Sequence, residues 1–195
     1  MGNQQIRAFI AIELPDELKL ALIQLQTELQ SARQSFVKWV VPEGIHLTLK
    51  FLGNIAVDNI NEIIEAINRA SKGISPFQVE TTDLGVFPNS RNPRVFWLGI
   101  GGNLDSLINL QKRIDDVMKP MGFVPEKRAF TPHLTLARIR ESASLQNRRE
   151  FSNLIDRAHF DIKYKIGINS ISLMRSQLLP GGAVYTCLGE VKLAI

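Results

Sequence analysis

The chain has 195 residues, of which 45% are hydrophobic and 22% charged, and its formal net charge is +4. This composition is typical of one soluble globular domain, or of two small lobes that share a core. No apolar run approaches the roughly 18 residues that cross a membrane. The N-terminal residues lead almost directly into a strand pattern, so we expect no signal peptide and a cytoplasmic location. A single cysteine, Cys187, fits a reducing compartment and lies in an apolar run, so we expect it to be buried.

Hydrophobic periodicity predicts strands and helices in the first half of the chain. We expect strands at 7–14, 36–41 and 45–52, and helices at 15–31 and 58–72. The first helix opens with Pro15, since proline is tolerated in the first turn of a helix. Four aromatic residues in this half and at the start of the next fall in strand patterns and are expected in the core: Phe9, Trp39, Phe96 and Trp97.

The second half of the chain has a similar pattern. We expect strands at 76–87, 94–100, 133–139, 162–175 and 183–193, strand-like residues at 123–124, and helices at 104–118 and 145–158. Loops rich in turn-forming residues lie at 88–93 and 180–182. Because hairpins join many of these strands, and no linker divides the chain, we predict an α+β fold with two largely antiparallel sheets flanked by helices.

The same four residues, His-Leu-Thr-Leu, occur at 46–49 and again at 133–136. In a strand, side chains alternate between faces, so the histidine and threonine share one face and the two leucines share the other. The leucines can anchor each strand in a core. Two such strands facing each other would bring two imidazoles and two hydroxyls into one site.

The offset of 87 between the tetrads extends upstream. Without gaps, it gives ten identities between positions 7 and 49 and their counterparts, where chance gives roughly two or three. The matches outside the tetrads pair Arg7 with Arg94, Phe9 with Phe96, Leu20 with Leu107, Gln24 with Gln111, Phe36 with Phe123 and Val37 with Val124. A fixed period indicates repeated architecture. We therefore predict one two-lobed domain over 1–195, built of units at about 6–87 and 93–174 and related by a pseudo-two-fold axis.

Positive charge is concentrated around the second tetrad. Residues 1–97 carry a net charge of −1 and residues 98–195 carry +5, and the window 119–149 includes Arg138, Arg148 and Arg149. A local basic field favours a ligand that carries phosphate. The alternative is a solvated basic face without a binding role.

Two histidines in one site can act as a general base and a general acid, because each titrates near neutral pH. In-line displacement at phosphorus needs both roles on opposite sides of one atom, and threonine hydroxyls can hydrogen-bond the phosphate oxygens. Two other readings stay open on the residues alone: a zinc site, which normally needs three or four ligands, and a pair of histidines with only a structural role.

The residues around the tetrads extend the pattern. The first tetrad continues as Lys50-Phe51-Leu52-Gly53, and the second is preceded by Phe130-Thr131-Pro132 and followed by Ala137-Arg138. With these surroundings the chain resembles the two-histidine phosphoesterase superfamily, and within it the RNA 2′,3′-cyclic phosphodiesterases, also called 2′-5′ RNA ligases. The resemblance covers nearly the whole chain. It implies a bilobal α+β fold with both histidines in a central cleft, and neither a metal nor another cofactor.

The resemblance also implies a reaction and residue roles. The reaction is the opening of a terminal 2′,3′-cyclic phosphate of RNA to a 2′-phosphate. Apart from the resemblance, we expect the protein to be a monomer. His46 would protonate the leaving 3′-oxygen and His133 would activate water. Thr48 and Thr135 would hold the phosphate, and Arg138 would be a further phosphate contact. Two alternatives are a ligase of 2′-5′ linkages, which is the same site run in reverse, and an RNA-end-binding protein without catalysis.

Strict alternation makes two further predictions about the ends of the motif strands. It places Arg138 on the leucine face, opposite His133, so that Arg138 reaches the site only if the strand ends or bulges nearby. It places Lys50 on the face of His46, where Lys50 is an additional candidate for the site.

Overall fold

The computed structural model describes residues 4–30, 34–179 and 182–194. Its strands are β1 (Gln5–Ile12), β2 (Val37–Trp39), β3 (Leu47–Ala56), β4 (Phe77–Phe87), β5 (Val95–Gly102), β6 (His133–Ile139), β7 (Lys165–Ile168), β8 (Ser170–Leu179) and β9 (Gly182–Lys192). Its helices are α1 (Asp16–Gln30), α2 (Ile60–Ser71), α3 (Leu104–Met118) and α4 (Leu145–Ile155), with short 3₁₀ turns η1 (Pro42–Gly44), η2 (Val57–Asn59) and η3 (Lys119–Met121).

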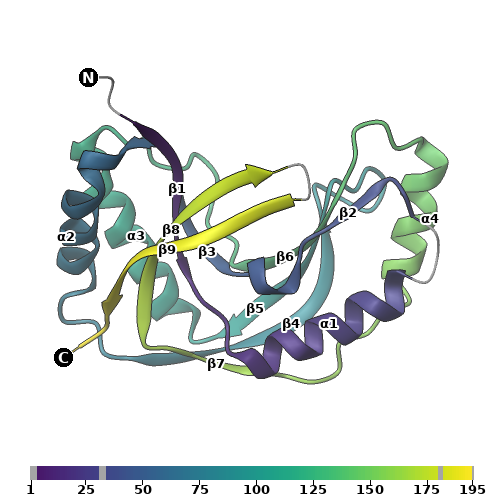
Figure 1. Ribbon diagram of the computed structural model, residues 1–195. Helices are drawn as coiled ribbons and strands as arrows, with labels where there is room; N and C mark the ends of the chain where they lie inside the picture. Colours follow the sequence, from purple (N-terminus) through teal and green to yellow (C-terminus); the bar gives the residue numbers. More distant parts are fainter. Residues whose placement is uncertain (1–3, 31–33, 180–181, 195) are drawn as a thin grey trace.

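Within the described residues, nine strands form one antiparallel sheet in the order β7-β4-β5-β6-β3-β1-β8-β9, with β2 paired to the end of β6. The α+β prediction is confirmed. The two predicted sheets are joined into one by a single residue pair, Leu47 of β3 with Leu134 of β6. On one side of this junction lie β1, β8 and β9, and on the other lie β5, β4 and β7 (Figure 1).

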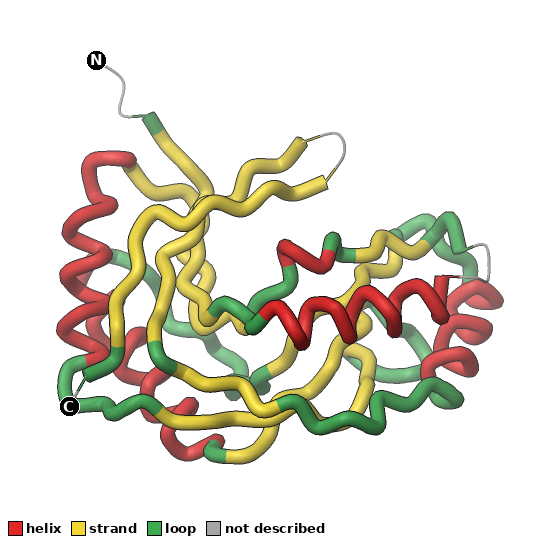
Figure 2. The backbone as a smooth tube through the Cα atoms, turned by 60° about the horizontal axis from the view of Figure 1, so that its bottom comes forward, coloured by secondary structure: helices red, strands yellow, loops and turns green. Residues whose placement is uncertain are grey.

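The helices form two pairs at opposite ends of the sheet, α2 with α3 and α1 with α4 (Figures 1 and 2). Each pair combines elements from both halves of the chain. Gln26 of α1 donates to the carbonyl of Leu136 in β6, and Gln111 of α3 donates to the carbonyl of Leu49 in β3. The two halves of the chain therefore interlock, because each half contributes a helix that packs beneath the motif strand of the other half.

The main core lies between the helices and one face of the sheet. Leu18 and Leu22 of α1, Ile63 and Ile67 of α2, and Leu98 of β5 are fully buried there. Burial of such side chains contributes about 1.5–3 kcal/mol each and provides most of the driving force for the fold. A second, small cluster lies on the other face, where Phe9, Ala11 and Met174 pack together with Tyr185.

Several elements differ from the sequence-based expectations. β3 continues past Gly53, which takes a left-handed φ of 74° and still pairs with Ala8. Residues 123–124 form no strand, and the Val124 carbonyl instead accepts a hydrogen bond from Lys50. The expected strand at 162–175 divides into β7 and β8, because β7 pairs with β4 whereas β8 pairs with β1 and β9. Helix α4 ends at Ile155 rather than 158. The turn expected at 180–182 lies largely outside the described residues.

Cys187 is exposed, so its predicted burial is wrong. It lies on β9, which is an edge strand of the sheet; an apolar run on an edge strand need not be covered on both faces. In the described part of the chain, no helix has the length and apolar character that crossing a membrane requires.

Candidate active site

The structure brings the two His-Leu-Thr-Leu tetrads together at the junction of the sheet. Leu47 and Leu134 pair directly and are both 0% exposed, so they anchor β3 and β6 in the core. Extending this antiparallel register by one residue on either side of the pair sets His46 opposite Thr135, and Thr48 opposite His133, on the other face. Residues diagonal to each other on one face of a regular ladder lie roughly 7–8 Å apart. That spacing is suited to a phosphate group between the two imidazoles.

Both histidine rings are oriented by the backbone two residues earlier. His133 Nδ1 donates to the carbonyl oxygen of Thr131 at 2.7 Å. His46 makes the corresponding hydrogen bond to the backbone of Gly44. A carbonyl can only accept, so Nδ1 of His133 carries the proton, and its Nε2 is left as the nitrogen that can exchange a proton with a ligand.

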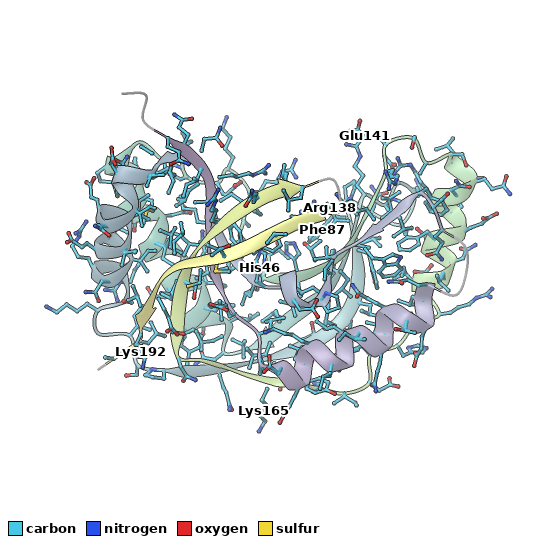
Figure 3. The ribbon with its side chains drawn as sticks, viewed as in Figure 1. His46, Phe87, Arg138, Glu141, Lys165 and Lys192 are labelled. Carbon is cyan, nitrogen blue, oxygen red and sulfur yellow. The ribbon has the colours of Figure 1, made fainter. Side chains whose placement is uncertain are left out.

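Aromatic rings enclose both histidines on the site face. Phe9 stacks on His46 with ring centroids 4.4 Å apart, and Tyr185 meets the ring of His46 edge-on at 5.1 Å. Phe87 meets His133 edge-on at 5.0 Å, with Trp97 at 6.5 Å. Figure 3 shows His46 and Phe87 in the middle of the molecule, between the two pairs of helices. The prediction that Phe9 lies in a core is confirmed, because Phe9 is buried in the small cluster on this face. Trp97 is half-buried and belongs to neither core cluster, so its predicted place in the core is wrong. Trp39 and Phe96, by contrast, do pack against each other and the core residue Phe151.

Burial by these rings lowers the pKa of both histidines. The pKa of His46 falls from 6.5 to about 4, because desolvation outweighs the hydrogen bond to Gly44 and the charge of Glu13, which both raise it. The pKa of His133 is also lowered, first by burial and further by the positive charge of Arg138, against the hydrogen bond to Thr131. Both rings are thus neutral near pH 7 without a ligand.

A β-bulge in β6 places Arg138 on the face of His133. In the pairing of β6 with β5, Thr135 lies opposite Trp97 and Ala137 lies opposite Phe96, so Leu136 is an extra residue. Leu136 and Ala137 both face the core, and the alternation after them is reversed. The bulge therefore lies where it turns the Arg138 side chain to the face of His133, and the positive charge of Arg138 lowers the pKa of His133.

A corresponding bulge in β3 turns Lys50 away from the face of His46. Leu49 is the extra residue there, because Thr48 lies opposite Ala11 and Lys50 lies opposite Ile10. Lys50 is 2% exposed, forms an ion pair with Asp115 of α3 and donates to the Val124 carbonyl. The prediction that Lys50 faces the site is wrong. Phe51 takes that place, 55% exposed and packed at an angle on Phe9.

Sequence reasoning missed Lys38. The register of β2 with β6 sets Lys38 directly opposite Arg138, and both side chains are exposed. Like charges facing each other across strands are destabilising unless an anion lies between them. The signal in the sequence was a lysine alternating with Val37 and Trp39 in a short strand, but its partner strand could not be known.

The two remaining arginines of the basic window differ in placement. Arg148 is 7% exposed, and its guanidinium donates to the carbonyls of Pro93, Ala143, Arg140 and Glu141. It therefore fixes the loop around β6 and α4 instead of facing a ligand. Arg149 is exposed on α4.

A groove of about 630 Å³ opens beside His46. Its walls include Gly44, whose backbone binds the His46 ring, and Tyr185, whose ring contacts it. The rest of the lining comes from η1 and its preceding residue and from the β8–β9 hairpin: Val41, Glu43, Leu179, Gly182, Ala183 and Val184. A side chain at Gly44 would bring a Cβ within 2.8 Å of the Tyr185 ring, so this close approach requires glycine.

Among the described residues, no group of three or more His, Cys, Asp or Glu could hold a metal ion.

The fold and the facing tetrads define a phosphoesterase with two histidines, and comparisons with known proteins specify the family. The sequence model of the LigT like phosphoesterase family matches the chain twice, over residues 12–97 and 101–185. A protein of Methanothermobacter thermautotrophicus named RNA 2′,3′-cyclic phosphodiesterase is 35% identical, over 93% of this chain and 96% of that protein. A protein of the same name from Thermotoga maritima is 31% identical, over 95% and 94%. The chain belongs to the LigT like phosphoesterase family.

Solved structures agree with this assignment. A Thermus thermophilus protein matches with a TM-score of 0.77 and 28% identity, over 96% of this chain and 98% of that one. Escherichia coli LigT in complex with 3′-AMP matches with a TM-score of 0.78, over 98% of this chain and 100% of LigT. Its identity of 23% limits that second likeness to the fold.

Proposed function

We propose that this protein is an RNA 2′,3′-cyclic phosphodiesterase that uses His46 and His133 as an acid–base pair. The observation that carries the proposal is the pairing of Leu47 with Leu134, which brings the two tetrads onto one face. Curated relatives at least 30% identical over nearly the whole chain carry the name of this activity.

In the proposed reaction, Nε2 of neutral His133 takes a proton from water as the water oxygen attacks phosphorus. The bond from phosphorus to the 3′-oxygen breaks, and protonated His46 gives its proton to that oxygen, which leaves a 2′-phosphomonoester. The Thr48 and Thr135 hydroxyls donate to the phosphate oxygens. Burial lowers the pKa of both rings, that of His46 to about 4, but the neighbouring charges act in the directions of this assignment, because Arg138 favours neutral His133 whereas Glu13 favours protonated His46. The anionic substrate itself raises the pKa of both rings on binding.

The surroundings of the two histidines support an orientation of the substrate. Lys38 and Arg138 form a positive pair on the side of His133, where the RNA backbone would lie. On the side of His46, Tyr185 and the exposed Phe51 offer faces on which a base can stack. The cytoplasmic location and the monomeric state stay predictions.

The test is incubation with a nucleoside 2′,3′-cyclic phosphate in excess EDTA, followed by chromatography of the product. We expect the 2′-phosphate. Formation of the 3′-phosphate would contradict the assigned leaving group. Binding without turnover would favour a protein that only holds RNA ends, and loss of turnover in EDTA alone would contradict the metal-independent mechanism.

A further inference from the structure

The two histidines differ in the residue that lies opposite each of them on the outer neighbouring strand. His133 pairs across β5 with Gly99, which has no side chain. Ile12 of β1 pairs with Leu47, so the next step of the register sets Glu13 opposite His46. Ile12 and Leu47 are both buried in the core, which puts Glu13 and His46 together on the site face. In these two strand pairings, one imidazole therefore has a carboxylate residue opposite it and the other has a glycine.

A buried serine fixes the carboxylate of Glu13. Ser172 of β8 pairs with Ala11, is 2% exposed and donates from Oγ to Oε1 of Glu13 at 2.7 Å. A buried hydroxyl that donates to a charged acceptor makes a stronger hydrogen bond than a neutral pair does. Glu13 itself is exposed, so this bond limits how far its side chain swings from His46.

Other ionisable groups near His46 do not supply this charge. Tyr185 of β9 contacts the ring edge-on, and His133 lies diagonally across β6. Lys50 of the same strand points into the core, where Asp115 pairs with it. Glu43 in η1 lines the groove but is not among the charges that act on the ring. Among the described residues, Glu13 is the charged side chain whose field acts on His46.

We propose that Glu13, held by Ser172, is a positioning residue that opposes the effect of burial on His46 and favours its protonated form as the acid, and that Gly99 leaves His133, the base, without a matching carboxylate. The inference rests on the proposed function. It explains how two tetrads of identical sequence take different roles: the first strand of the chain adds a negative charge beside one histidine, and Arg138 adds a positive charge beside the other.

The test compares Glu13→Gln with the wild-type protein in two measurements. Titration of the histidine ring signals by NMR should show a lower pKa for His46 in Glu13→Gln and an unchanged pKa for His133. In the kinetics, kcat/KM above neutral pH is proportional to the small fraction of protonated His46, so it should fall tenfold for each unit by which that pKa falls. Below the pKa of both histidines, neutral His133 limits the rate, so the two proteins should converge.

Three variants complete the test. Ser172→Ala should also lower the pKa of His46, by less than Glu13→Gln does. Glu13→Asp keeps a carboxylate, so it should give a His46 pKa between those of Glu13→Gln and the wild-type protein. Glu43→Gln, which removes a nearby carboxylate from the groove, should leave the His46 titration unchanged. An unchanged His46 titration in folded Glu13→Gln, or an equal shift in His133, would overturn the inference. If the wild-type protein did not hydrolyse cyclic phosphates, the proposed function would fail while the titrations still tested the effect of Glu13 on His46.

Discussion

At the scale of single residues, the site depends on two imidazoles that share one geometry. Each ring is bound to the backbone two residues earlier, and each has a threonine across the neighbouring strand. Alternation within a strand is enough to predict that the histidine and threonine of a tetrad share a face. It could not predict the rings that enclose them, because Phe9 and Tyr185 reach His46 from strands whose order in the sheet does not follow from their own sequence.

Substitution of either histidine tests the acid–base pair. We expect His46→Ala and His133→Ala each to lower kcat by about 10²–10⁴ in hydrolysis of a cyclic mononucleotide. The double variant should lose far less than the product of the two, because groups that act in one step are not additive. His159→Ala is the control, since His159 lines a separate cavity. A single variant that retains more than half of the activity would remove its histidine from the mechanism.

The lowered pKa of His46 predicts how stability depends on pH. The folded protein takes up a proton on His46 only near pH 4, whereas the unfolded chain does so near 6.5. Stability from the neutral ring is therefore complete above pH 6.5 and is lost as the pH falls through this window, by about 3 kcal/mol in total. Urea unfolding between pH 4 and pH 8 should show a steeper loss in the wild-type protein than in His46→Gln. Parallel pH profiles would contradict the shift.

At the scale of elements, a bulge in each motif strand decides which side chain at the strand end faces the site. Strict alternation wrongly placed Lys50 toward the site, and it allowed Arg138 to reach the site only through a bulge, which β6 has at Leu136 as β3 has at Leu49. A bulge depends on partners far away in the chain, such as the glutamines that bind the two leucine carbonyls. The hydrophobic pattern, by contrast, predicted most helices and strands to within a few residues, because that pattern reflects which side of an element is buried.

The bulge in β6 can be tested through Gln26, whose amide donates to the carbonyls of Val40 and Leu136 at 2.9 and 3.1 Å. We expect Gln26→Leu to reduce the free energy of unfolding by about 1–3 kcal/mol, because it removes the side-chain donor from the Val40 carbonyl and one of two donors from the Leu136 carbonyl, whose other donor is the Val40 amide. It should also raise KM, since Arg138 would no longer be held in position to contact the phosphate. Gln111→Leu is the matched variant under the other bulge, and it should destabilise the protein without this rise in KM. Equal changes in KM for Gln26→Leu and Gln111→Leu would show that the placement of Arg138 does not depend on the bulge in β6.

At the scale of the whole molecule, the two halves place corresponding elements around the junction. β1 pairs with β3 as β5 pairs with β6, and each half contributes the helix beneath the other's motif strand. This arrangement, together with the two matches to one family model, supports the proposal of a duplicated unit. The gap-free offset of 87 fails in the first strand, however. Phe9 lies opposite Phe51 and Val95 lies opposite Arg138, so Phe9 corresponds to Val95 and not to Phe96.

The two halves thus share a backbone but differ in chemistry around the junction. Where the first half has Phe51 after its bulge, the second has Arg138, and Lys38 adds a second positive charge there. Phosphates of an RNA chain should therefore run past β6 and β2. The net charge of +5 in residues 98–195 agrees with this path, although the buried Arg148 takes no part in it.

Lys38→Gln should weaken the binding of an oligonucleotide with a cyclic phosphate end and leave the binding of a cyclic mononucleotide nearly unchanged. Only the longer substrate has phosphates beyond the reacting one. Arg138→Gln should weaken both, since it lies beside His133. Each lost phosphate contact should flatten the slope of log K against log salt by about 0.7 for single-stranded RNA. Arg149→Gln is the charge-matched control on α4. The measurement is KM for both substrates across a salt series. If Lys38→Gln showed the same salt dependence of KM for the oligonucleotide as the wild-type protein, the RNA chain would not run past β2.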